Sequence, residues 1–119
     1  MSVTRYEITT GPGPRMSRCV VKGDMVYLAG LTASDTTGDV KNQTQQILDK
    51  IDGYLATAGT NKSNLMQANL WITDMANFSA MNEIWNAWVD HENQPVRACV
   101  RADLARPEIL VEIMVTATK

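Results

Sequence analysis

Two stretches near the C-terminus decide the fold of this chain: Pro95-Val-Arg-Ala-Cys-Val-Arg-Ala102 and Leu110-Val-Glu-Ile-Met-Val-Thr-Ala-Thr118. Successive side chains of an extended strand point to opposite faces, so residues two apart share a face. In the first stretch this alternation separates small apolar residues from Arg97, Cys99 and Arg101. In the second it separates valine and isoleucine from Glu112 and Met114. Each stretch is therefore predicted to be a strand with one apolar face and one face that carries a charge.

The two strands are predicted to pair with each other as an antiparallel hairpin around the loop that joins them. If both apolar faces pack on the core, Arg97, Cys99 and Glu112 emerge together on the opposite face. Leu110 and Met114 flank Glu112, so this carboxylate lies on a partly apolar surface that we expect something to cover. The residues alone leave two interpretations of the charged pair open, a cross-strand Arg–Glu ion pair with no further role or a polar site.

The rest of the chain predicts an α+β fold. Apolar residues at helical spacing indicate helices over residues 42–58 and 78–88. Alternating residues indicate further strands over residues 4–10, 17–21, 25–29 and 66–73. This order of elements predicts that both helices pack on one face of a mixed β-sheet. A chain of 119 residues is expected to form a single domain, residues 1–119.

Several polar and glycine positions have a structural interpretation. The pair Gly23-Asp24 suits a two-residue hairpin turn, and Gly59 suits the C-terminal end of the first helix. Asn77 is expected to cap the second helix by accepting from its free amides. The polar side chains of the first helix are expected to face solvent: Gln43, Gln45, Gln46, Asp49 and Asp52.

Three further positions have two interpretations each. Gly30 ends the third predicted strand, where it forms either a turn or bulge, or a point at which a ligand approaches the backbone closely. Asn82 is rotated from the centre of the apolar stripe of the second helix, so it either faces solvent or points into a cleft. His91 is the only histidine and lies in a polar loop, where we interpret it as exposed rather than catalytic.

Composition limits the classes of partner. The formal net charge is −2 and the basic residues are scattered, which argues against a nucleic-acid partner. No apolar run approaches the roughly 20 residues that cross a bilayer, and the N-terminus lacks a signal-peptide pattern, so a cytoplasmic protein without membrane attachment is expected. Cys19, Cys99 and His91 lack metal-ligand spacing, so a metal site is not expected.

The sheet face opposite the helices predicts an association surface. In a monomer it would expose Trp71, Cys99, Leu110 and Met114 together with the charged pair, and an apolar patch of this kind usually marks an interface. A closed homo-oligomer is therefore predicted. The polar site would then lie between subunits, with residues contributed by different chains.

Four stretches, in their order and spacing, resemble one family. They are Val26-Tyr-Leu-Ala-Gly-Leu31, Gln43-Thr-Gln-Gln-Ile47, Trp71-Ile-Thr-Asp-Met-Ala-Asn-Phe-Ser-Ala-Met-Asn82, and Pro95-Val-Arg-Ala-Cys-Val100 followed by Val111-Glu-Ile113. Over most of its length the chain resembles the RidA (YjgF/YER057c/UK114) family. The resemblance implies a chorismate-mutase-like fold and a homotrimer with clefts between its subunits. It also implies hydrolysis of reactive 2-imino acids to 2-keto acids and ammonia, without a cofactor.

The resemblance also implies roles for individual residues. Arg97 is similar to the family arginine that clamps the substrate carboxylate, and Glu112 to the acid that positions or activates water. Gly30, Asn82 and Cys99 correspond to positions that line the same cleft in relatives.

One position departs from the family pattern. Many relatives have a Pro-Tyr-Ser segment whose tyrosine closes the cleft, whereas this chain has Met16 at that position. The substrate preference is therefore open. Two alternatives to a deaminase remain: a non-catalytic pocket that binds a small carboxylic metabolite, and an endoribonuclease or translation inhibitor. The charge balance and the lone histidine argue against the second.

Overall fold

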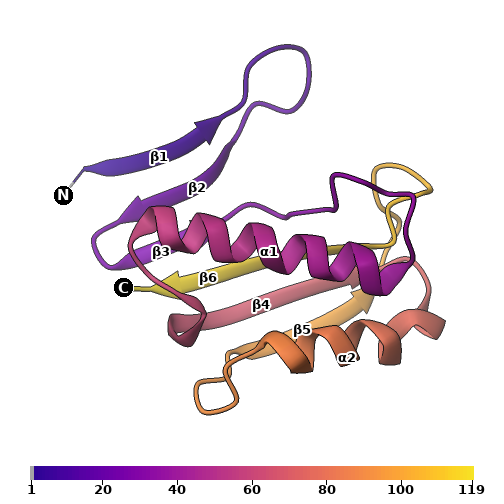
Figure 1. Cartoon of the computed structure of the whole chain (residues 1–119). Coiled ribbons are helices and arrows are strands. Elements are labelled where there is room, and N and C mark those ends of the chain that lie inside the picture. The colour runs from indigo at the N-terminus through magenta and orange to yellow at the C-terminus, as the bar shows by residue number, and fades with distance from the viewer. Residues whose placement is uncertain (1) are drawn as a thin grey trace.

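The computed structural model describes residues 2–119, which form one six-stranded sheet and two α-helices (Figure 1). The helices are α1 (Val40–Ala58) and α2 (Phe78–Trp88), with short 3-10 turns at Lys62–Asn64 and Met75–Asn77. The strands are β1 (Val3–Ile8), β2 (Ser17–Lys22), β3 (Met25–Leu28), β4 (Leu65–Ile72), β5 (Val96–Arg101) and β6 (Val111–Thr118). No helix within residues 2–119 is both long and apolar enough to cross a membrane.

The strand order is β1-β2-β3-β6-β4-β5, and all neighbours are antiparallel except β4 and β5. The mixed sheet predicted from sequence is confirmed, but the predicted hairpin between β5 and β6 is wrong. Strand β4 lies between them and pairs with both. This arrangement satisfies the backbone groups of β4 along both of its edges, whereas a β5–β6 hairpin would leave β4 outside that pair.

Both helices lie on one side of the sheet, called here the helix face, as the sequence predicted (Figure 1). The other side is called the open face. On the helix face of β4, Ala68, Leu70 and Ile72 are fully or almost fully buried. They pack with the apolar stripe of α1, which includes Ile47 and Ile51. The core therefore occupies the space between the helices and the sheet.

The register of β5 reverses the faces expected from its sequence. Arg97 lies opposite Ala68 and Cys99 opposite Leu70, so both belong to the helix face. The apolar side of β5 is on the open face instead, where Val96 is 70% and Val100 is 49% exposed. The expectation that the apolar side of β5 packs on the core is therefore wrong. Because β5 is an edge strand, a long side chain such as arginine can extend past the covering helix.

Local turn and cap predictions are partly confirmed. Gly23 has φ 58° in the two-residue connection between β2 and β3, and Gly59 has φ 85° after α1, so both glycines occupy the left-handed region. Asn77 makes no side-chain cap to α2, contrary to expectation. Asp74 instead accepts from the Ala76 amide in the 3-10 turn before it, so the chain enters α2 through a capped turn.

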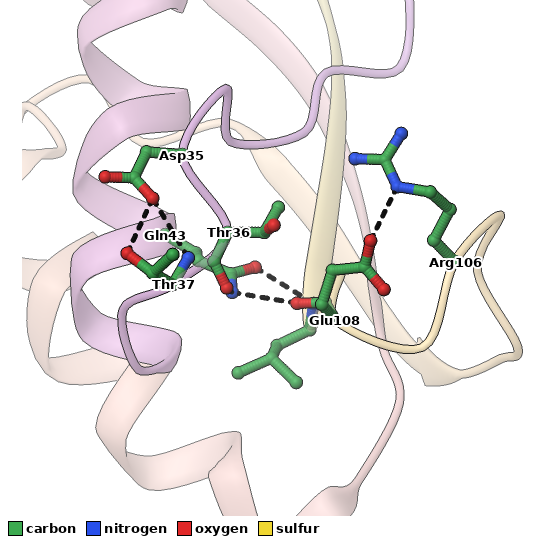
Figure 2. A network of polar contacts seen from close by, with 7 residues as sticks. Asp35, Thr36, Thr37, Gln43, Arg106 and Glu108 are labelled. Atoms are coloured by element: carbon green, nitrogen blue, oxygen red, sulfur yellow. Dashed lines mark hydrogen bonds and ion pairs between the residues drawn. The ribbon is translucent and has the colours of Figure 1, made fainter.

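The expectation that Gln43 faces solvent is wrong, because its side chain is completely buried. Figure 2 shows the polar network around it. Its Nε2 donates to the carbonyl oxygens of Thr36 at 3.3 Å, Gly38 at 3.2 Å and Glu108 at 3.0 Å. Its Oε1 accepts from the Leu110 amide at 2.9 Å. One amide group therefore joins the loop before α1 to the loop before β6.

The Gln43 network generates a stability prediction. Gln43→Ala removes the partner of four backbone groups and is expected to lower the free energy of unfolding by about 2–4 kcal/mol. Gln45→Ala is the matched control, because this exposed glutamine of the same helix contacts only Asp49 through its side chain. Its effect should stay below about 0.5 kcal/mol. Urea unfolding measures both values, and equal effects would contradict the network's role.

Candidate functional site

The Arg97 guanidinium lies against two aromatic rings of α2. Its central carbon is 5.9 Å from the centre of the Phe78 ring and 5.6 Å from that of Trp85. Phe78, Asn82 and Trp85 are spaced by four and then three residues, so they share one side of the helix beneath the edge strand β5. Cation–π attraction and aromatic packing hold the guanidinium in this position.

Arg97 and Asn82 line the same cavity, which has a volume of about 520 Å³. Its other lining residues are Trp85, Asn86, Val89, His91, Gln94 and Pro95. The buried Oδ1 of Asn82 has no hydrogen-bond partner. The ion pairs within residues 2–119 join Lys41 to Glu83 and Arg106 to Glu108, so none involves Arg97. A cationic donor and a neutral acceptor are therefore both available to a small ligand in this cavity.

Glu112 and Gly30 form a second cluster on the open face. Glu112 lies opposite Trp71 of β4, and a Cβ added to Gly30 would collide with the Glu112 carboxylate. Reciprocal backbone hydrogen bonds between Leu31 and Ile113, of 2.9 and 3.1 Å, hold the two segments together. The missing side chain of Gly30 therefore makes room for a carboxylate of this same chain. The close-approach interpretation of Gly30 applies, with Glu112 rather than a ligand as the group that approaches.

Burial of Glu112 raises the pKa of its carboxyl group above the ordinary value, because desolvation disfavours the charged form. Arg97 makes no contribution to this shift. The two residues lie on opposite faces of one sheet, so the expectation that they emerge together from a single chain is wrong. The same geometry excludes a cross-strand ion pair between Arg97 and Glu112 within one chain.

Cys99 shares the helix face with Arg97 and packs against the core. Burial raises the pKa of its thiol, while the neighbouring positive charge of Arg97 partly offsets that increase. Leu110 also packs against the core. Of the four residues expected on an exposed sheet face, Trp71 and Met114 therefore lie on the open face and Cys99 on the helix face, while Leu110, just before β6, is partly buried against the core.

Met16 lies in the connection between β1 and β2. Its carbonyl accepts from the Thr9 amide at 2.8 Å, and its amide donates to Thr9 Oγ1 at 2.9 Å. These two hydrogen bonds with Thr9 hold together the two ends of the connection. Met16 is not among the residues that line the cavity of Arg97.

Sequence reasoning missed the aromatic support of Arg97 and assigned Phe78 and Trp85 to a general core stripe. The available signal was their spacing with Asn82, which marks one side of α2. His91 is exposed as expected, but it also lines the cavity of Arg97, and its Nε2 contacts the Asn86 carbonyl oxygen. Its closeness to Arg97 depends on the path of the loop before β5, which the sequence pattern does not specify.

Comparisons with known proteins identify related sequences and structures. A family model described as endoribonuclease L-PSP matches residues 11–119. A RutC family protein from Haemophilus ducreyi is 38% identical over 115 residues, which cover 97% of this chain and 95% of that protein. A YjgF family protein from Neisseria meningitidis is 36% identical, with a TM-score of 0.91 and coverage of 100% of this chain and 96% of that one. An uncharacterized protein from Pseudomonas aeruginosa is 29% identical, with a TM-score of 0.93 and 99% of each chain covered. These solved structures confirm the α+β fold.

The surroundings of Cys99 generate a reactivity prediction. Alkylation of Cys99 by iodoacetamide should be slow at neutral pH, because burial disfavours the thiolate. The pH at which the alkylation rate reaches half its maximum should lie above that of a free cysteine. Arg97→Met should move that pH higher still, since the guanidinium charge favours the thiolate. Mass spectrometry of labelled peptides measures both rates, and the fully buried Cys19 is an internal control that should stay unmodified. Rapid labelling of Cys99 at neutral pH would contradict this description of its environment.

Proposed function

The chain belongs to the YjgF/RutC family, and on this premise we propose that it hydrolyses reactive 2-imino acids to 2-keto acids and ammonia. The reaction takes place in clefts between the subunits of a homotrimer. Each cleft combines the Arg97 cavity of one chain with the Glu112 carboxylate of a neighbouring chain.

The observation that carries this proposal is the unpaired guanidinium of Arg97 at the wall of a cavity. Two aromatic rings hold it, and no carboxylate within residues 2–119 neutralises it. A guanidinium offers two parallel donors that match the two oxygens of a carboxylate. Arg97 therefore binds the substrate carboxylate and fixes the orientation of the adjacent imine carbon.

The free acceptor of Asn82 complements this clamp. Its buried Oδ1 lines the same cavity as Arg97, where it can accept from the N–H of a protonated imine. A 2-imino acid carries its carboxylate and its nitrogen on adjacent carbons. The two groups thus recognise the two ends of the same functional unit, and the unsatisfied acceptor gains a partner when the substrate binds.

Glu112 activates the water. Water adds to the iminium carbon while the carboxylate takes one of its protons, which gives a neutral amino alcohol. Glu112 returns this proton to the amine, and the C–N bond then breaks with loss of ammonia as the ionised Glu112 accepts the hydroxyl proton and the keto group forms. A base with a raised pKa suits this exchange near neutral pH, and the positive charge of the neighbouring chain's Arg97 favours the ionised form that starts it.

Two features support a site between chains. Within one chain Arg97 and Glu112 face opposite sides of the sheet, so no single chain supplies both groups to one cleft. The open face also exposes large apolar side chains, including Tyr27, Val96, Val100 and Met114, which association would cover. A trimer of the kind implied by the family resemblance would cover this face and join the two halves.

A non-catalytic pocket for a small carboxylate is the second candidate, because Met16 supplies no hydroxyl group where many relatives have a tyrosine. It keeps the roles of Arg97 and Asn82 but needs no base. A ribonuclease, the activity in the description of the family model, has less support. The only histidine is exposed, and the formal net charge of −2 opposes attraction to RNA.

The carboxylate clamp is tested with imino acids generated freshly by an amino-acid oxidase. Arg97→Ala should lower kcat/KM for ammonia release at least about a hundredfold, because the substrate loses its charged partner. Arg101→Ala is the matched control, since this exposed arginine lies four residues further along the same face of β5. Size-exclusion chromatography should give the same assembly for both variants. Undiminished turnover in Arg97→Ala would remove the proposed role.

The site between chains is tested by mixing two inactive variants. Glu112→Gln should retain substrate-analogue binding but lose turnover, and Arg97→Ala should lose both. When the two variants are unfolded together and refolded, each mixed trimer contains one interface with both native residues. About a third of the sites in such a trimer should then be active. If a single chain supplies both residues, the mixture stays inactive. Retained turnover in Glu112→Gln would favour a role for Glu112 other than that of a base.

A further inference from the structure

A second and larger cavity, of about 830 Å³, lies on the helix face away from Arg97. Its walls come from β1, the start of β2, the segment after Gly30 and the outer side of α1. The lining includes the charged side chains of Glu7, Arg18, Lys50 and Arg106 and the rings of Tyr6 and Tyr54. None of them lines the cavity of Arg97, so the two cavities are separate.

Arg18 and Lys50 bring two positive charges together in this cavity. Burial lowers the pKa of Lys50, and the charge of Arg18 lowers it further, so the two cations lie close enough to repel each other. Neither belongs to the ion pairs formed within residues 2–119. The Lys50 ammonium donates to the Thr32 carbonyl oxygen at 2.7 Å, which fixes it at the cavity wall. The pair is therefore held in place without an ion-pair partner among residues 2–119.

Glu7 and Arg106 also line the cavity. Glu7 lies beside the Tyr54 hydroxyl, and burial together with this carboxylate raises the pKa of Tyr54 to about 12. Arg106 at the cavity wall pairs with Glu108 at 2.8 Å (Figure 2). Neither Arg18 nor Lys50 forms an ion pair with Glu7, and the cavity lining carries three basic side chains against this one carboxylate.

We propose that this cavity binds a phosphate monoester of a small organic molecule, at a site distinct from the deaminase cleft. A phosphate monoester carries close to two negative charges at neutral pH, which match two cations that form no ion pair within residues 2–119. A phosphate group alone leaves most of 830 Å³ unfilled. The ring of Tyr6 and the side chains of Leu31 and Ala33 provide an apolar wall for an organic body.

The side chains around the two cations also favour a phosphate. Thr32 and Ser34 also line the cavity, and their hydroxyl groups can donate to phosphate oxygens. A 2-imino acid, the proposed substrate of the Arg97 cavity, carries only one carboxylate, so it would pair with one cation and leave the other unpaired. The ligand of this site therefore belongs to a different chemical class from the proposed substrate, and the proposal stands independently of the deaminase activity.

The test is an NMR titration of the assembled full-length protein at constant ionic strength. Phenyl phosphate is the probe. Phenol is the control that has the ring without the phosphate group, and inorganic phosphate is the control that has the anion without the ring. Phenyl phosphate should shift amide signals of residues 31–34 and 50–54 with a saturable dependence on its concentration. Phenol should shift none of them, and inorganic phosphate should bind more weakly than the ester.

Variants locate the binding. Arg18→Met and Lys50→Met should each weaken phenyl phosphate binding at least about tenfold, because each removes a charged partner of the dianion. Lys50→Arg keeps the charge and should retain most of the affinity. Lys22→Met, at an exposed lysine outside the cavity, is the control for loss of a charge and should change nothing. No saturable shift, equal affinity in all variants, or loss of binding in Arg97→Ala would each overturn the proposal.

Discussion

The position of β4 between β5 and β6 is the constraint on which the rest of the structure depends. Paired residues of neighbouring strands share a face, so the register with β4 decides which side chains of β5 and β6 lie on each face of the sheet. Arg97 pairs with Ala68 and therefore lies on the helix face, whereas Glu112 pairs with Trp71 and lies on the open face. A shift of either strand by one residue would reverse its faces and bury the wrong side chains. The separation of the two charged groups thus follows from the same register that builds the core.

Sequence periodicity predicts which segments are strands better than it predicts how they pair. The alternation of residues 96–101 fits two arrangements, one with valines inward and one with Arg97 and Cys99 inward. The first looks more favourable in an isolated chain, because it buries apolar side chains. The structure has the second, in which Val96 and Val100 are exposed on the open face. Those valines fit the proposed interface between chains, which a prediction based on the core of a single chain does not consider.

The clusters around the charged residues were also only partly predictable. Gln43 has the composition of a surface residue, and only the meeting of two loops that are distant in sequence explains its burial. Asn82 stood out because it is rotated from the apolar stripe, whereas Phe78 and Trp85 did not, since aromatic residues on a helix usually signal core packing. Arg18 and Lys50 gave no signal at all. They are separated by thirty-two positions (50 minus 18), and their closeness depends on how β2 lies beside α1.

The opposition of the two half-sites also limits the symmetry of the proposed assembly. In a two-fold dimer the same patch faces itself, so the Arg97 cavity would meet a second Arg97 cavity unless one patch wrapped around the edge of the sheet. A head-to-tail contact instead joins the β5 edge of one chain to the open face of the next. Such contacts close into a ring in which every chain gives one half-site to each neighbour. A ring leaves neither half unused, and it covers the apolar open face of every chain. The proposed heterologous interface therefore accounts together for the face reversal of β5, the exposed valines and the separation of Arg97 from Glu112.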